Sequence, residues 1–430
     1  MSPTDQLITD FKAKKWSSKP FERMADIIRG KPDQVLPFVR AVLNKLPDSG
    51  TFLHASLSFL PQEEWPEVVE ASVGRLIESK EHESAESVIA YASLQCPESL
   101  HHWLDQLLDI APNSGAYYET WPWRQSGSLH LARLEEVIAN HPDLEVRRKA
   151  WQKGFETRND EVVHRMIELE LSVDLDHHLR RARLSGALNI NDYLRIVACE
   201  WAAGTLRPLA ARSGFHLTFP SGYVEEDRPW LKPIIHPTWS LVSQLEAIEV
   251  QFGGYGVGTC AHCGGRSHNL ITSRQFPQLE NVFEGGALCF ETCLSCLGWE
   301  AEIIYCEHSD DGSAQMLNRT GKTGEPQFPA VPLAECTANL IPTPKRWQYQ
   351  DWALSNSREN LNRFGGEPCW IQNADYPTCP GCEKTMRFLA QLDSDLPTSD
   401  GGEWLWGSGG ICYMFWCSEC RMSAALWQCT

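Results

Sequence analysis

The first two hundred residues carry apolar positions at the three- and four-residue spacing that is typical of amphipathic helices. One such stripe comprises Val35, Phe38, Val39, Val42, Leu43 and Leu46, and another comprises Val69, Val73 and Leu76. Glycine and proline residues lie between the stripes, where they favour turns. No alternation of apolar and polar residues is long enough to predict a sheet there. The pattern therefore predicts an all-α domain over residues 1–205.

The helix spacing in this domain resembles that of helical repeat proteins. The segment from Asp143 to Ala150 opens a helix in the manner of a HEAT repeat, and a second helix is predicted from about Asp160. The helix-turn-helix spacing is roughly 30–40 residues, which is within the range of such repeats. Two arrangements stay open: a HEAT-like solenoid, which would offer an extended binding surface, and a helical bundle that stabilises the second half of the chain.

The helical pattern ends in a segment of different composition. Between Phe215 and about Leu245 the sequence contains Pro220, Pro229, Pro233 and Pro237, and proline at this density stops helices. Aromatic residues accompany the prolines, which favours a packed connector over a loose linker. We assign residues 206–250 to this connector.

Four Cys-x-x-Cys pairs follow the connector. They are Cys260/Cys263, Cys293/Cys296, Cys379/Cys382 and Cys417/Cys420. Two thiolates three positions apart on a tight turn can bind one Zn²⁺ ion, and a second such turn completes the tetrahedron. The spacing therefore predicts two structural zinc sites, one formed by the first two pairs and one by the last two.

Other uses of these cysteines need a different setting. A redox pair normally lies in a βαβ context, which the sequence does not indicate here. A disulfide framework needs an oxidising compartment, and Met1 to Trp16 contains no apolar core of signal-peptide length. Reduced thiols buried without a metal stay open as an alternative.

The cysteine-rich half contains an internal duplication. Phe252-Gly253-Gly254 precedes the first pair and Phe364-Gly365-Gly366 the third, while Gly285-Gly286 and Gly409-Gly410 stand before the second and fourth. Strand-like segments at 269–276 and 386–392 separate the paired knuckles, and further runs at 299–305 and 423–427 follow them. We predict two β units, 251–345 and 346–430, packed as one pseudo-symmetric body. The fold class is thus α+β, with a HEAT-like all-α domain followed by a duplicated, zinc-ribbon-like β-rich region.

The second unit also carries a wider motif. Phe364 to Gln372 is followed by the knuckle at 379–382, the run Met386 to Asp393, Gly409-Gly410, an aromatic strand and the knuckle at 417–420. This order resembles the YwqG-like domain family of bacterial proteins and the C-terminal domain of eukaryotic programmed cell death protein 2. The first unit departs from it, because Tyr255-Gly256 replaces the Pro-x-Trp element.

The resemblance implies a β-rich fold and a role in binding another protein. Members of this group are regarded as immunity proteins of bacterial toxin systems or, in eukaryotes, as escorts of a ribosomal protein. It implies no catalytic residues. The second unit, which keeps the full motif, is the better candidate for a partner-binding groove.

Charge narrows the class of partner. The chain carries 38 Lys and Arg against 56 Asp and Glu, a net charge of −18, of which −6 falls in residues 1–220 and −12 in 221–430. Such acidity argues against nucleic acid or an anionic membrane surface and favours a basic protein, either a toxin domain or a ribosomal protein. No apolar run reaches the eighteen or so residues that span a bilayer. We expect a soluble, cytoplasmic protein.

Catalytic signatures are few. No Gly-x-Ser-x-Gly elbow or His-Glu-x-x-His helix is present, and the glycine-rich stretch 253–258 precedes a knuckle rather than a helix that could hold a phosphate. The candidate partner contacts are Trp404, Trp406, Asp393, Asp395, Asp400 and Glu403. We therefore expect a non-enzymatic protein, with an immunity protein as the leading hypothesis. An escort of a basic client and an enzyme with an unrecognised site are the alternatives.

Overall fold

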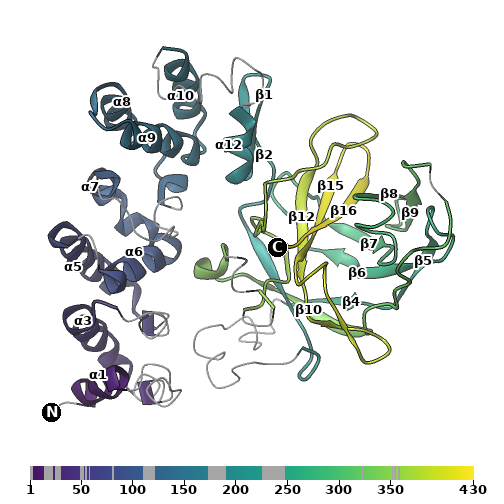
Figure 1. The fold of residues 1–430 in the computed structure, drawn as a ribbon, viewed down its shortest axis with the longest axis horizontal. Coiled ribbons are helices and arrows are strands. Elements are labelled where there is room, and N and C mark those ends of the chain that lie inside the picture. Colours follow the sequence, from purple (N-terminus) through teal and green to yellow (C-terminus); the bar gives the residue numbers. More distant parts are fainter. Residues whose placement is uncertain are drawn as a thin grey trace. The chain divides into compact units, whose positions relative to one another are not determined.

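The computed structural model describes residues 3–13, 23–24, 31–48, 53, 56–57, 59–79, 82–109, 122–172, 190–224, 247–321, 323–350, 352, 355–356 and 359–430. The chain divides into two compact units (Figure 1). The first, which we call the helical unit, contains 1–197, 201–206 and 230–235. The second, the β unit, contains 198–200, 207–229 and 236–430. Most of the proline-rich part of the predicted connector, 225–246, lies outside the described residues.

The helical unit is built of short helices that pack mainly on their neighbours in the sequence (Figure 1). Within the described residues the α-helices are α1 (Pro3–Ala13), α3 (Val35–Lys45), α5 (Trp65–Glu78), α6 (Glu83–Gln95), α7 (Leu104–Asp109), α8 (Leu131–Asn140), α9 (Leu144–Glu156), α10 (Asp160–Ser172) and α12 (Ile190–Ile196). Helix α5 packs on α6, α8 on α9, and α9 on α10. This order is that of a stacked solenoid rather than of a closed bundle.

The predicted apolar stripes form the core of this unit. Val35, Phe38, Val39, Val42 and Leu43 are all buried on one side of α3, as the spacing indicates. Each such face removes several aliphatic side chains from water, which stabilises the fold by about 1.5–3 kcal/mol per side chain.

Helix α9 begins and packs as the repeat pattern predicts. The side chain of Asp143 accepts a hydrogen bond from the backbone N–H of Glu145, so it caps the helix at the predicted residue. The buried indole of Trp151 donates to the carbonyl oxygen of Met166 in α10 at 3.0 Å. The pair α9–α10 is thus joined by both packing and a hydrogen bond.

The β unit contains a twelve-stranded, mostly antiparallel sheet in the order β5-β6-β4-β10-β3-β11-β12-β15-β16-β8-β9, with β7 paired to β6 (Figure 1). Its strands are β3 (Gly214–Thr218), β4 (Ile248–Phe252), β5 (Tyr255–Thr259), β6 (Arg266–Phe276), β7 (Gly286–Thr292), β8 (Ile304–His308), β9 (Ala314–Leu317), β10 (Cys336–Pro342), β11 (Arg363–Gly365), β12 (Arg387–Asp393), β15 (Ile411–Cys417) and β16 (Met422–Gln428). Two small two-stranded sheets pair β1 (Cys199–Ala202) with β2 (Thr205–Pro208) and β13 (Leu396–Pro397) with β14 (Glu403–Trp404).

The sheet curves so that the strands at its two edges, β7 at one and β8–β9 at the other, come close together. The backbone N–H of Cys289 in β7 donates to the carbonyl oxygen of Gly312, in the turn between β8 and β9, at 2.9 Å. Strand β15 is buried along its whole length. Its Cys412, Met414 and Trp416 join one apolar cluster, and the alternate side chains from Ile411 to Cys417 join another. An apolar run without alternation is thus explained by burial on both faces.

The duplication seen in the sequence is present in the backbone. Gly253 and Gly254 both have positive φ, as do Gly365 and Gly366 at the matching places. The preceding Phe252 pairs with Ile271 in β6, and Phe364 pairs with Ala390 in β12. Each repeat therefore has the same glycine bend, followed by the same antiparallel strand pair between its knuckles.

The two repeats exchange strands. Strand β3, which precedes the first repeat's glycine bend, pairs with β11 of the second repeat. Strand β10, which precedes the second bend, pairs with β4 of the first repeat. Strands β8 and β16, which follow the last knuckle of each repeat, pair with one another.

This exchange corrects the predicted domain boundaries. Residues 251–345 and 346–430 do not form separate compact units, because their strands alternate within one sheet. The predicted connector, 206–250, contributes β3 and β4 to the centre of that sheet. The strand predicted at 299–305 begins only at Ile304, because the residues before it form turns that follow the knuckle. None of the helices in the described part of the chain is long and apolar enough to span a membrane.

Candidate metal centres

The structure brings the eight predicted ligands together in two groups of four. The first group is Cys260, Cys263, Cys293 and Cys296, and the second is Cys379, Cys382, Cys417 and Cys420. Within each group all four sulfur atoms lie within 4.8 Å of one another. The pairing is the one that the sequence predicts: each centre takes one knuckle before and one after its strand pair.

The first knuckles of the two centres share one turn geometry. In the first centre, Cys260 N–H donates to Gly265 O at 2.7 Å and its carbonyl accepts from Gly264 N–H at 2.9 Å. In the second, Cys379 N–H donates to Lys384 O at 2.8 Å and its carbonyl accepts from Glu383 N–H at 2.9 Å. The repeated hydrogen bonds direct both thiols of each turn toward one point.

The sulfur positions fit a tetrahedral metal ion. A tetrahedron with metal–sulfur bonds of about 2.3 Å has sulfur–sulfur edges of about 3.8 Å. The Sγ atoms of Cys260 and Cys296 are 3.8 Å apart, as are those of Cys263 and Cys293. In the second centre, Cys382 and Cys417 are 3.6 Å apart. Both sets can therefore hold a metal ion without rearrangement of the turns.

Crowding of the thiols gives each group a strong preference for a cation. Hydrogen bonds from Cys293 and Cys296 lower the pKa of the Cys260 thiol. The hydrogen bond to Cys260 raises the pKa of Cys296. Four thiolates at these distances repel one another, and a divalent cation at their centre offsets that repulsion.

An ion pair joins the two knuckles of the second centre. Lys384, just after Cys382, pairs with Glu419, which lies between Cys417 and Cys420. The pairing lowers the pKa of the exposed Glu419 carboxyl group. Because both side chains are more than half exposed, the pair adds little stability, and the sulfur atoms define the site.

The glycine-rich stretch beside the first centre does hold an anion, but the anion is a side chain of the protein. The buried carboxylate of Glu291 accepts from the N–H groups of Val257 at 3.0 Å and Gly258 at 3.2 Å, and from the hydroxyl of Ser267. A Cβ atom at Gly256 would lie 2.4 Å from the Glu291 carboxyl carbon. The glycines thus admit Glu291, and the stretch has a structural role.

Two of the predicted partner contacts are wrong. Trp406 is fully buried, with its indole N–H donating to Asp393 O at 3.1 Å. Asp393 ends strand β12, and its carboxyl oxygens accept from the N–H groups of Ser394 at 2.8 Å and Asn356 at 3.0 Å. Asp393 belongs to the interior because β12 continues to it, and Trp406 packs into the apolar core from the turn that precedes β15.

The other four predicted contacts lie at or near the surface. Asp400 and Glu403 are exposed, whereas Asp395 and Trp404 are half-buried. Asp400 accepts from the Thr398 hydroxyl at 2.6 Å and from Gly402 N–H at 3.3 Å, so it stabilises the turn between β13 and β14. Its carboxylate is therefore already engaged within its own hairpin.

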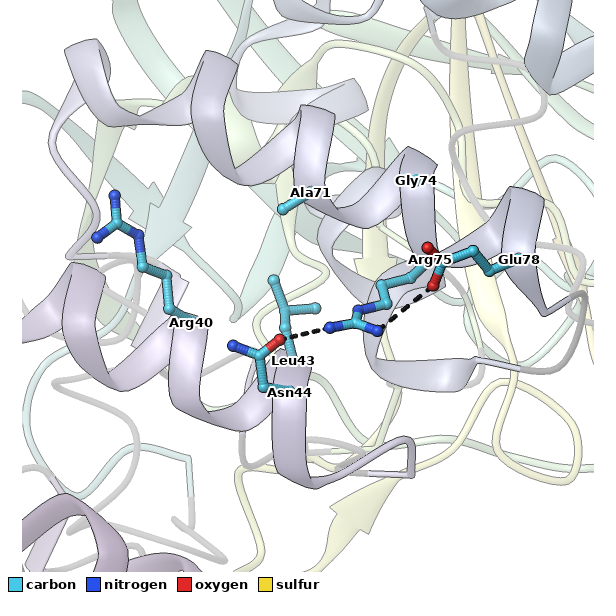
Figure 2. A pocket seen from close by; sticks show the side chains of 7 residues that line it. All are labelled: Arg40, Leu43, Asn44, Ala71, Gly74, Arg75 and Glu78. Carbon is cyan, nitrogen blue, oxygen red and sulfur yellow. Dashed lines mark hydrogen bonds and ion pairs between the residues drawn. The ribbon is translucent and has the colours of Figure 1, made fainter.

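A shallow groove lies between α3 and α5 of the helical unit (Figure 2). Its two arginines are engaged: Arg75 donates to Asn44 Oδ1 at 2.6 Å and pairs with Glu78 at 3.4 Å, and Arg40 pairs with Glu67. The groove is open to solvent, and its charges are satisfied locally. It therefore gives no support to a specific ligand.

The exposed aromatic residues of the β unit lie elsewhere than predicted. Trp299 and Phe328 expose 49% and 47% of their surface, and their ring centroids are 4.7 Å apart. Trp299 follows the knuckle cysteine Cys296 by three residues. The sequence signal was present in the Gly298-Trp299 pair, which breaks the expected strand immediately after the knuckle.

Comparison with known proteins adds one short match. A stretch of 69 residues is 41% identical to the uncharacterized protein YpfL of Salmonella typhimurium (strain LT2), which covers 16% of this chain and 15% of that protein. No protein-family model matches the chain, and no solved structure matches it. The chain thus shares only a small part of that relative's length, and its function has to be argued from its own residues.

Proposed function

We propose that this chain is a zinc-stabilised, non-enzymatic protein that acts by binding a basic protein partner, and that it is an immunity protein for a bacterial toxin. The observation that carries the proposal is the pair of Cys₄ groups. Four thiolates select a soft or borderline ion such as Zn²⁺, and they leave no coordination position for water or substrate. Such zinc stabilises a fold instead of supplying a catalytic hydroxide.

The zinc would hold the two ends of each central strand pair together. In the second centre, Cys379 and Cys382 precede β12, Cys417 is the last residue of β15, and Cys420 follows it. Because the ligands must be deprotonated, binding of the metal is coupled to folding of the strands between them. Reduced thiol ligands suit a reducing compartment, so we place the protein in the cytoplasm.

The acidity of the chain supports a basic partner. A net charge of −18 speeds encounter with a positively charged protein and disfavours nucleic acid. The resemblance of residues 364–430 to the YwqG-like family supports the immunity role in particular.

Purification of the tagged chain from its own host, with mass spectrometry of what co-elutes, tests this function. We expect one basic protein at a constant ratio to the bait, and co-expression of the chain should restore growth to cells that produce that protein. The variant Cys429→Ser changes a half-buried cysteine outside both four-cysteine groups and should retain the partner. The variant Cys379→Ser should lose the partner together with the zinc ion of the second group. A ribosomal protein in place of a toxin would transfer the proposal to the escort role. Absence of any stoichiometric protein would contradict both.

A further inference from the structure

Three aromatic side chains from separate segments meet beside the first metal centre. The Trp299 ring packs against Phe328 in a tilted arrangement, with ring centroids 4.7 Å apart, and its centroid lies 5.9 Å from that of Trp427 in β16. Trp299 and Phe328 are each about half exposed, and Trp427 is half-buried. We call these three residues the aromatic platform. A contiguous group of exposed apolar side chains, unlike a single one, is typical of an interaction surface.

The platform is mounted on rigid parts of the structure. The Trp427 indole N–H donates to Leu297 O at 3.0 Å. A Cβ atom at Gly298 would lie 2.3 Å from the Trp427 ring, so the indole rests directly against the backbone of the turn. The N–H of Trp299 donates to Cys296 O at 3.1 Å, which ties the platform to a metal-ligating residue. The rings are therefore held in place before any partner arrives, which lowers the entropy cost of binding.

The segments that build the platform are acidic. Between Arg274 and Arg319 the sequence contains eight Asp and Glu residues and no Lys or Arg, and residues 323–344 contain two Glu and no Lys or Arg. Glu302 and Glu325 are exposed on these segments. The carboxylate of Glu300, next to Trp299, accepts from the N–H of Gln327, next to Phe328, at 3.2 Å. A carboxylate therefore lies where the Trp299 segment meets the Phe328 segment.

Two exposed or half-buried tyrosine rings of the β unit are already covered by arginine side chains of the same chain. Tyr255 is 45% exposed, and the guanidinium of Arg266 lies 4.3 Å from its ring centroid. Arg319, at the border of the acidic stretch, lies over Tyr305 at 5.5 Å. Tryptophan attracts a cation more strongly than tyrosine does.

We infer that the aromatic platform is the docking site for a cationic segment of the protein partner, with arginine side chains lying on Trp299 and Phe328 and paired to the neighbouring glutamates. The inference rests on the proposed function, because it names the surface that receives the basic partner. Desolvated arginine–aromatic contacts combine cation–π attraction with charge-assisted hydrogen bonds. The acidic surround supplies the complementary field.

A defined peptide tests the platform without the natural partner. Full-length protein labelled with 5-fluorotryptophan is titrated with a twelve-residue peptide of alternating arginine and proline, and ¹⁹F NMR follows each indole. The Trp299 signal is assigned from the variant Trp299→Phe. We expect this signal to shift with the arginine peptide and to stay in place with a peptide that carries glutamate instead of arginine.

Paired variants decide the outcome. Trp299→Ala/Phe328→Ala should weaken peptide binding by about five- to thirtyfold, because both cation–π contacts are lost. Trp352→Ala removes another partly exposed indole of the same unit and should leave the affinity unchanged, and all variants should retain their metal. A Trp299 signal that does not move, or an unchanged affinity in the double variant, overturns the platform. If the double variant still captures the natural partner, the proposed function stands while this site for it fails.

Discussion

The buried carboxyl group of Asp393 makes the stability of the β unit depend on pH. Asp393 is 2% exposed, and burial raises its pKa to about 8, against about 3.9 for a free aspartate. Between these values the folded state keeps a proton that the unfolded state has lost. The free energy of unfolding should therefore fall as pH rises, by up to about 1.4 kcal/mol per pH unit, and level off above pH 8.

We expect Asp393→Asn to remove this slope, because the amide cannot ionise. Urea unfolding of wild type and variant between pH 6 and 9, followed by tryptophan fluorescence, measures it. The matched control is Asp400→Asn, an exposed carboxylate of the neighbouring hairpin, which should keep the wild-type slope. An equal slope in Asp393→Asn and wild type would show that other groups control the dependence.

The glycine bend that the two repeats share should not tolerate a side chain. Gly253 has φ of +76°, and a Cβ atom there would lie 2.3 Å from Ala334 O. Gly253→Ala should thus cost well over the roughly 1–2 kcal/mol of an unfavourable φ alone. Gly401 also has a positive φ, +86°, but a Cβ atom there would meet nothing within 4 Å. The control variant Gly401→Ala therefore measures the cost of the unfavourable φ alone. Similar melting temperatures for the two variants would contradict the close approach.

The sequence predicted the two four-cysteine groups correctly and placed two of the six expected partner contacts, Asp393 and Trp406, wrongly at the surface. The Cys-x-x-Cys spacing encodes a local turn, so the eight ligands could be assigned without knowledge of the fold. Burial depends on where a strand ends, and Asp393 and Trp406 look like loop residues in the sequence. The interior position of Asp393 follows from the length of β12, and that of Trp406 from its hydrogen bonds to Asp393 and Ser394 at the end of that strand.

At the scale of elements, reciprocal strand exchange makes the two repeats interdependent. Strand β11 of the second repeat has β3 and β12 as its neighbours, and β3 lies more than a hundred residues upstream in the chain. A fragment of residues 346–430 would leave the edge of β11 unpaired and expose apolar side chains such as Phe364.

We therefore expect the fragment 346–430 to lack a cooperative unfolding transition even with zinc present, whereas 198–430, which retains β3, should fold. Circular dichroism and thermal unfolding of both fragments check this. A cooperative transition in the shorter fragment would mean that the second repeat folds as an independent domain, and would contradict its dependence on β3.

The exchange could not be inferred from the sequence because pairing between distant strands leaves no periodic signal. The repeat pattern correctly indicated the strands between the knuckles, β6 and β12, since these are flanked by motifs. Strands β3 and β10 lie outside the duplicated motifs, and β3 falls in a proline-rich segment that suggests a connector. The helices were easier to predict because their contacts are local, as in α9 and α10.

At the scale of the whole molecule, the chain is acidic and combines a solenoid-like helical unit with an intertwined β unit that carries two four-cysteine groups able to hold a metal ion. The sequence was sufficient for the α+β class and for the two sets of ligands. The partner cannot be derived in the same way, because a binding surface has no fixed spacing, and the aromatic platform becomes visible only when residues 299, 328 and 427 are brought together.

Native mass spectrometry of the purified full-length chain tests the central claim most directly. We predict two Zn²⁺ ions per chain, one in the variant Cys379→Ser, and two in Cys429→Ser, which changes a cysteine outside both centres. Removal of zinc from the wild type should abolish the folded β unit, because metal binding and folding are coupled. A folded wild-type protein whose mass shows no bound metal would contradict the assignment of the two cysteine groups as structural zinc sites. Two zinc ions retained by Cys379→Ser would contradict it as well.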